Sequence, residues 1–323
     1  MTKWPRSAHR IKALLFIIAV AFLIDVHTVL GAPEVQGSIA VVAGYRVDSL
    51  DWNIAGDDSG LNPNVLSELT WSDLQIYQFG LLGTAENIAT KFKVFSPYLL
   101  AAVGCGQIVS GKNQDSDYRG DNRTHEFSRS NNHADSGTVF DLSLAGGGKV
   151  HLGDSRYTLA PLLGFSYYAQ NLTMNDGYQT ISDAPSSLGP IAGLNSTYDT
   201  AWYGPWLGLD ATAFLSRAWT LNAGIEFHRL YYQAKANWNL RSDLAHPKSF
   251  EHEGNGYGMI FHLGSAYALT SRLKLTVAAD LRRFSIRDGI DRIFSTDGQM
   301  GTSRLNEVNW QSQLLTAGLL YNF

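Results

Sequence analysis

The sequence contains a single cysteine, Cys105, and only 17% of its residues are charged. One cysteine excludes an intramolecular disulfide framework. The formal net charge of −4 argues against a nucleic-acid partner, because nucleic acids favour basic surfaces. After the amino-terminal residues, the chain has no apolar run long enough for a membrane-spanning helix. The chain must therefore be stabilised without disulfides, and after its first residues it offers no helix that could cross a membrane.

The first 32 residues have the three-part pattern of a secretory signal peptide. A basic start precedes the apolar run "ALLFIIAVAFLI" (13–24), and the small residues Gly31 and Ala32 follow. This run is too short to span a bilayer comfortably. An uncleaved anchor is the alternative, and Asp25, which cuts the run short, argues against it. We expect cleavage near Gly31 or Ala32, leaving one domain over residues 33–323 that is more acidic than the full chain.

The mature segment consists of stretches in which apolar and polar side chains alternate. In the final stretch, "QSQLLTAGLLYNF", counting back in twos from Phe323 gives an apolar face with Tyr321, Leu319 and Ala317, whereas the opposite face is smaller or more polar. The stretch "RLKLTVAADLRR" (272–283) has the same period of two. Such strands fit an outer-membrane barrel, with the apolar face toward lipid and the mixed face toward a hydrated lumen. A soluble β-sandwich shows similar alternation, so the period alone leaves both folds open.

Short and long connections alternate along the chain, and this pattern favours the barrel. In bacterial outer-membrane barrels the short connections are periplasmic and the long ones extracellular. Tyr and Trp also recur near the ends of the strand segments, as aromatic girdles would require. We therefore predict an all-β fold, a ten-stranded antiparallel transmembrane β-barrel with short periplasmic turns and long extracellular loops, in the outer membrane of a Gram-negative bacterium. The turns are expected near 84–91 and at 151–156, 215–218 and 269–272, and the loops near 54–64, 113–137, 174–199, 236–256 and 287–307.

Two aspartates lie where the third predicted strand enters the second long loop, in "GKNQDSDYRGDNR" (111–123). Asp115 and Asp117 are two residues apart, so both would point to the same side of a continuing strand. Two carboxylates held close together cannot both ionise freely, and such a pair can hold or activate a water molecule. The alternative is a hydrated loop tip with no chemistry.

These residues also resemble a known family, the omptins, which are ten-stranded outer-membrane proteases with a site at the extracellular rim. The omptin Asp-x-Asp-aromatic motif, which ends the third strand, is similar to "DSDY" (115–118), and the Ser-x-Leu-x-Trp motif of the second strand is similar to "SELTW" (67–71). The order of turns and loops agrees over nearly the whole mature chain. The resemblance implies an endopeptidase that cleaves polypeptides at basic residues, in contact with outer-membrane lipid; lipopolysaccharide is the candidate lipid.

The resemblance implies a second half of the site on the fourth long loop, where omptins have an Asp-Glu-His triplet whose Asp and His share a face. The corresponding region here is "NLRSDLAHPKSFEHEG" (239–254), in which Asp243 and His246 are three residues apart and Pro247 follows. A regular strand would place them on opposite faces; a bulge could restore their alignment, although proline disfavours a paired strand. The predicted catalytic residues, which would activate a water for attack on a carbonyl, are Asp115, Asp117, Asp243 and His246.

Other polar residues give weaker signals. Glu226 and His228 lie two apart on the polar face of a strand, and we interpret them as a hydrogen-bonded pair in the lumen. His125, Glu126 and the neighbouring His133 lie in the second long loop, but nothing there fixes a tetrahedral set of ligands. We therefore expect a solvated loop, and we predict neither a metal nor another cofactor.

Three functions from different classes remain open at this point. The first is the omptin-like endopeptidase, and the second is a non-catalytic surface scaffold or adhesin whose loops bind a host or envelope component. The third is a narrow pore, which inward charges such as Lys274, Asp280 and Arg282 would obstruct. Whether Asp243 and His246 converge opposite Asp115 and Asp117 distinguishes the first two.

Overall fold

The computed structural model describes residues 35–87, 95–153 and 156–323, so the predicted signal peptide lies outside the described residues. The described chain is built almost entirely of antiparallel β-strands. Its helical content is limited to two single 3-10 turns, η1 (Asp121–Arg123) and η2 (Pro185–Ser187), and no helix in this part of the chain is long and apolar enough to cross a membrane. The strands are β1 (Val35–Ile54), β2 (Ser67–Asn87), β3 (Phe95–Gly120), β4 (Thr124–His133), β5 (Gly137–Leu152), β6 (Tyr157–Ser182), β7 (Gly189–Phe214), β8 (Trp219–Asn237), β9 (Phe250–Ala268), β10 (Leu273–Phe294) and β11 (Met300–Asn322).

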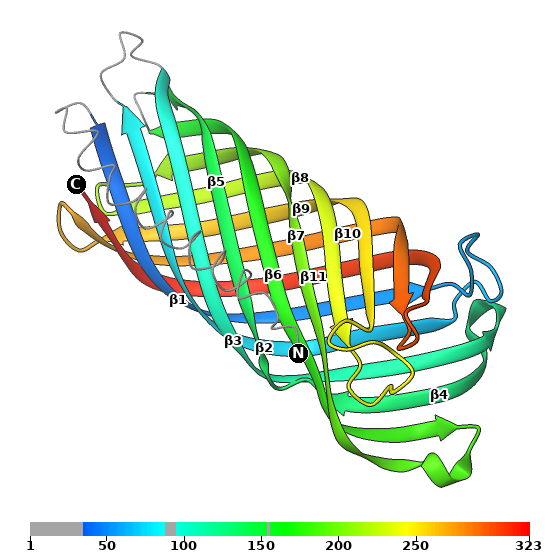
Figure 1. Ribbon diagram of the computed structural model, residues 1–323. Helices are drawn as coiled ribbons and strands as arrows, with labels where there is room; N and C mark the ends of the chain where they lie inside the picture. Colours follow the sequence, from blue (N-terminus) through cyan, green and yellow to red (C-terminus); the bar gives the residue numbers. More distant parts are fainter. Residues whose placement is uncertain (1–34, 88–94, 154–155) are drawn as a thin grey trace.

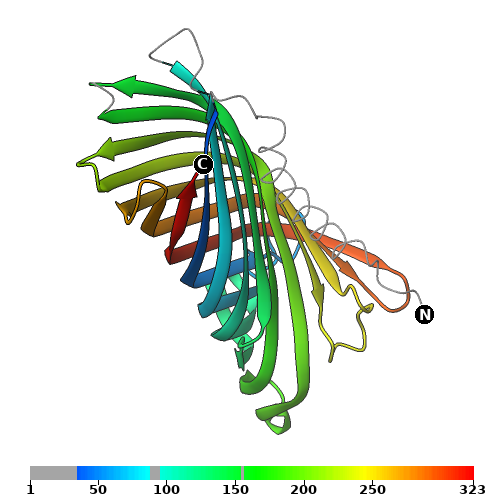
Figure 2. The same ribbon diagram turned by 90° about the vertical axis from the view of Figure 1, so that its left-hand side faces the viewer.

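The strands form one closed sheet. Most strands pair with their neighbours along the chain, β4 and β5 each pair with both β3 and β6, and the ring closes where β1 pairs with β11. Figures 1 and 2 show long, tilted strands that curl into this ring, with the start of β1 and the C-terminus at one end. The predicted all-β antiparallel fold is therefore confirmed.

The described residues form eleven strands, whereas the sequence analysis predicted ten. The difference arises between β3 and β6, where the two strands β5 and β4 lie end to end. β5 pairs with the N-terminal parts of β3 and β6, and β4 pairs with their C-terminal parts, which we call their outer parts. Figure 1 shows β4 beside the outer ends of β3 and β6. Residues 134–136, which connect the two strands, are not in strand conformation.

The predicted alternation between two faces is confirmed on β10 and β11. Leu315, Leu319 and Tyr321 are exposed on the outside of the ring, whereas Trp310 and Leu314 are buried inside it. Exposed leucine, valine and aromatic side chains occupy the outer face of the other long strands at similar heights. Together they form a band around the ring, which we call the apolar band.

Several connections differ from their predicted bounds. The predicted loops at 113–137 and 174–199 are mostly strand, because polar segments of β3, β4, β6 and β7 pair with one another beyond the apolar band. Their polarity made them resemble loops, although backbone hydrogen bonds are satisfied by pairing whatever the side chains are. The turns at 215–218 and 269–272 are short, as predicted. The turn predicted near 84–91 extends into residues outside the described part.

Aromatic side chains fill the interior of the outer half of the ring. Four strands separate β6 from β11 in either direction round the ring, yet the rings of Tyr168 and Trp310 lie 5.7 Å apart. Trp52 on β1 and Tyr198 on β7 are likewise on opposite walls, and their rings are 6.0 Å apart. Trp71 stacks on Tyr198 with an interplanar angle of 14°. The lumen is therefore crossed by packed rings at this level.

Candidate functional site

The two aspartates of the "DSDY" motif lie on the inner face of β3, beyond the apolar band. Val109 is the last exposed apolar side chain of β3 before them. The register places Asp117 between Ser67 on β2 and Ser128 on β4, and it places Asp115 between Leu69 and Ser130 on the same two strands. Both aspartates are partly buried. The structure thus brings the carboxylates to one side of a continuing strand, at the outer rim of the ring.

The surroundings of this pair favour retention of a proton. Burial, followed by the charge of Asp117, raises the pKa of Asp115 well above its ordinary value. Burial also raises the pKa of Asp117, although the hydroxyls of Ser67 and Ser128 oppose this by stabilising the carboxylate. The charge of the Arg241 guanidinium also opposes the rise in the pKa of both aspartates but does not cancel it. The pair therefore gains its full negative charge only as the pH rises.

The loop between β8 and β9 carries the other two predicted catalytic residues, and the structure does not join them. Asp243 accepts two hydrogen bonds from Arg241, at 2.8 and 2.7 Å, and these bonds lower its pKa to about 2. His246 Nδ1 lies 2.8 Å from Asn237 Oδ1, and its Nε2 lies 3.2 Å from the carbonyl oxygen of Arg241. Both imidazole nitrogens are thus engaged away from Asp243. A cation, Arg241, faces the aspartate pair in place of an Asp–His pair.

The sequence analysis overlooked a second histidine in the same stretch. The segment 250–252 is Phe-Glu-His, and its last two residues match the Glu-His of the omptin triplet. Phe250 takes the place of the triplet's aspartate. Phe250 and His252 both point inward from the start of β9 and are buried. In the omptin triplet the histidine lies two residues after the aspartate, and His252 has this spacing from Phe250. The match was overlooked because no aspartate precedes Glu251.

His252 is sealed within the aromatic interior. Its ring lies 4.8 Å from that of Trp52 and 5.1 Å from that of Phe250, and none of its surface is exposed. Its Nδ1 is 2.7 Å from the Tyr198 hydroxyl, and its Nε2 is 3.2 Å from Asp291 Oδ1 on the neighbouring strand β10. The histidine therefore has an acidic neighbour, but neither solvent nor a substrate reaches it in this arrangement.

The second-loop residues considered as metal ligands are dispersed. Glu126 pairs with Arg129 at 2.6 Å, and His133 lies 4.0 Å from Asp176. Across the described residues, no group of three or more His, Cys, Asp or Glu side chains is arranged to hold a metal ion.

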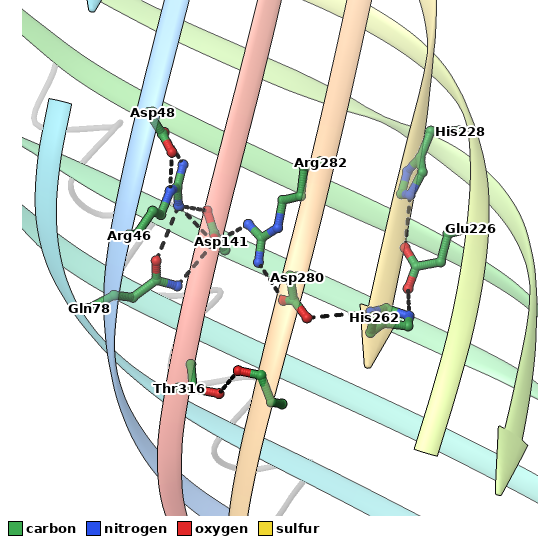
Figure 3. Close-up of polar contacts among 11 residues, drawn as sticks. Arg46, Asp48, Gln78, Asp141, Glu226, His228, His262, Asp280, Arg282 and Thr316 are labelled. Carbon is green, nitrogen blue, oxygen red and sulfur yellow. Dashed lines mark hydrogen bonds and ion pairs between the residues drawn. The ribbon is translucent and has the colours of Figure 1, made fainter. Parts of the chain in front are cut away.

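A layer of buried charges crosses the lumen at the height of the apolar band (Figure 3). Asp141 on β5 is its centre. It accepts hydrogen bonds from Arg46 on β1 at 3.1 Å, from Gln78 on β2 at 3.1 Å and from Arg282 on β10 at 2.7 Å. Arg46 also forms two hydrogen bonds with Asp48, of 2.7 and 2.5 Å. Four strands separate β5 from β10 in either direction, so the bond between Asp141 and Arg282 spans opposite walls.

The layer continues across β10, β9 and β8 through His262, which is surrounded by carboxylates. His262 lies within 4 Å of three carboxylates: Asp210 at 3.8 Å, Glu226 at 3.4 Å and Asp280 at 3.7 Å. Glu226 also lies 2.8 Å from His228 Nε2, which confirms the lumenal pair predicted from their spacing. Figure 3 shows Glu226, His262 and Asp280 linking β8, β9 and β10 to the Arg282 side of the layer.

The filled lumen leads to a prediction about conductance. Both the charged layer and the aromatic layer connect opposite walls, so we expect them to obstruct a continuous water path. The purified barrel is expected to insert into a planar lipid bilayer without stable single-channel current steps. A barrel of known conductance, inserted under the same conditions, is the control; reproducible steps proportional to voltage from this protein would contradict the closed lumen.

Two solved structures illustrate what the chain is similar to, and only the first has a TM-score high enough to support the fold. The crystal structure of the outer membrane protease OmpT from Escherichia coli matches with a TM-score of 0.67 at 15% identity, covering 90% of this chain and 97% of that one. The translocator domain of the autotransporter NalP from Neisseria meningitidis matches with a TM-score of 0.36 at 13% identity, covering 96% and 97% of the two chains. No curated protein sequence matches the chain.

The first of these likenesses shows the fold alone, because the identity is low. The family comparison goes further: residues 40–323 match the family described as Pom, Protochlamydia outer membrane protein, over nearly the whole described chain. The match places the protein in the outer membrane of a Gram-negative bacterium. The chain therefore belongs to the Protochlamydia outer membrane protein family.

Proposed function

We propose that the protein is a transmembrane barrel whose outer rim binds cationic groups of a polypeptide without hydrolysing it. In this proposal the apolar band lies in the membrane, the turns at 215–218 and 269–272 face the periplasm, and the β8–β9 loop faces the outside. Exposed apolar residues on the outer faces of the strands support the membrane placement, and the shortness of these two turns supports the orientation. Asp115 and Asp117 then face the exterior.

The proposal rests on the contacts and burial of the two histidines near the rim, His246 and His252. His246 has both ring nitrogens engaged with Asn237 and the Arg241 carbonyl, and His252 is buried beneath Trp52 and Phe250. A general base must reach the proton that it removes, directly or through one water. Neither imidazole meets that requirement here, whereas the carboxylates of Asp115 and Asp117 are partly open to solvent.

Omptin-like endopeptidase activity is the second candidate. It is favoured by the paired carboxylates, whose raised pKa values fit a site that holds a water molecule, and by a fold similar to that of OmpT. For hydrolysis, the β8–β9 loop would have to move so that His246 leaves Asn237 and turns toward the aspartate pair.

A binding experiment tests the proposal. The refolded barrel is expected to bind a fluorescent arginine-rich peptide, and Asp115→Asn/Asp117→Asn is expected to weaken binding about tenfold, or about 1.4 kcal/mol. Asp57→Asn/Asp58→Asn, on the exposed β1–β2 loop, is the matched control because it makes the same two substitutions elsewhere on the outer side. Equal weakening by both double variants would show non-specific charge attraction and would contradict a site at the aspartate pair.

The same site has an expected pH dependence. Because the pKa of Asp115 is raised, its carboxyl is protonated in mild acid and becomes negative as the pH rises. Affinity for the arginine-rich peptide should therefore increase from acidic to neutral pH. Asp115→Asn should flatten this dependence, as measured by fluorescence anisotropy at constant ionic strength. An unchanged pH profile in the variant would assign the titration to another group.

A further inference from the structure

The apolar band contains a groove in its outer surface. The groove has a volume of about 300 Å³ and lies across β3, β5 and β6. Its rim consists of large apolar side chains that are 38–62% exposed, and its floor consists of small residues and backbone. The rim residues are Leu99, Leu144, Leu163 and Phe165, and the floor is formed at Leu100, Ala145, Gly146 and Gly164.

Gly146 creates the depression. In the register it lies directly between Leu99 on β3 and Leu163 on β6, so it belongs to the outer face. A Cβ atom added to Gly146 would meet only the Leu99 side chain, at an ordinary distance of 3.4 Å. The space above Gly146 is therefore open, whereas a larger side chain would fill it.

The wall behind the groove is closed. A Cβ atom on Gly164 would lie 2.3 Å from the Trp206 ring, and Trp206 is only 2% exposed. Trp206 thus packs against the lumen side of this wall and fills the space behind it. The groove opens only outward, toward whatever surrounds the apolar band.

We infer that this groove holds an acyl chain of a phospholipid. Leu99 and Leu163 lie near the starts of β3 and β6, at the end of the ring that carries the 215–218 turn. The proposed orientation places that end toward the periplasm, and the periplasmic leaflet of an outer membrane consists of phospholipid. The inference rests on the proposed placement of the apolar band in the membrane. The groove is continuous with the band on three strands, and its lining is apolar, which leaves no polar group to orient a charged or hydrogen-bonding ligand. Apolar cavities of about 150 Å³ accept a benzene ring, so this volume suffices for a segment of a flexible hydrocarbon chain.

A photo-crosslinking experiment tests the inference. The barrel is reconstituted in vesicles of a phospholipid that carries a benzophenone in its acyl chain, and adducts are mapped by peptide mass spectrometry. They should be concentrated on the segments around Leu99, Leu144 and Leu163. Adding lipopolysaccharide in a second arm tests the source of the chain: the phospholipid adducts should persist, and their loss would overturn the inference by showing that lipopolysaccharide chains occupy the groove.

Two variants make the test specific. Gly146→Leu fills the depression and should lower these adducts severalfold, whereas Ala317→Leu, at an exposed position on the outer face of β11, should leave them unchanged. Adducts spread evenly around the band, or equal labelling in Gly146→Leu, would overturn the inference. If Gly146→Leu does not fold, the wild-type map alone decides. Failure of the wild-type barrel to co-float with vesicles would instead overturn the membrane placement.

Discussion

Asp141→Ala is expected to lower the free energy of unfolding by about 3–5 kcal/mol, the usual cost of removing one partner from a buried ion pair. Asp141 is 6% exposed and pairs with both Arg46 and Arg282, at 3.1 and 2.7 Å. Without it, Arg46 keeps Asp48 and Arg282 keeps only Asp280, so two guanidinium groups share too little negative charge inside the lumen. The ties from β5 to β1 and β10 would also be lost.

The measurement is urea unfolding of the micelle-folded barrel, followed by tryptophan fluorescence. Lys112→Ala is the matched control, because its pair with Asp73 is exposed at both partners and should contribute at most about 1 kcal/mol. A loss in Asp141→Ala no larger than in Lys112→Ala would show that water already hydrates the arginines, and the lumen would not be closed at this layer.

Trp71→Ala is expected to cost about 3–5 kcal/mol, as for other large-to-small changes in a packed interior. Trp71 is fully buried, stacks on Tyr198 from the opposite wall and donates a hydrogen bond from Nε1 to the carbonyl oxygen of Thr173 at 3.2 Å. Removing the indole leaves a cavity bordered by Tyr198 and deprives that carbonyl of a partner. The loss should appear as a lower urea midpoint.

Trp219→Ala is the control for this change. Trp219 is 49% exposed on the outer face of β8, where it contacts Tyr267, so its removal leaves no internal cavity. If Trp71→Ala and Trp219→Ala cost the same, the interior would be loosely packed and the aromatic layer would not seal the lumen.

Much of the fold could be predicted from the sequence because one face of each strand is apolar. The period of two at Leu315, Leu319 and Tyr321 assigned the outer face correctly, and the short turns at 215–218 and 269–272 marked one end of the ring. The predicted count of ten strands is not confirmed, because residues 124–133 form an additional polar strand beyond the apolar band, which resembles a loop in the sequence. Pairing there depends on β3 and β6, which are distant in the sequence.

The candidate site could be predicted only in part. The position of Asp115 and Asp117 on one face follows from local alternation, and the structure places both side chains on the same face of β3. The partners across the ring do not follow from local spacing: Arg241 faces the pair, and Asp243 pairs with that arginine instead of His246. Such contacts are set by how the β8–β9 loop folds over the rim, which no short motif specifies.

The most direct test of the central claim, binding without hydrolysis, is incubation of the refolded barrel and a fluorogenic dibasic peptide with lipopolysaccharide present. An active omptin under the same conditions is the positive control, and Asp115→Asn/Asp117→Asn is the matched variant. The account predicts that the peptide binds, that the aspartate variant binds it more weakly, and that neither protein cleaves it. Cleavage by the wild-type barrel that disappears in the aspartate variant would contradict the account and establish an endopeptidase.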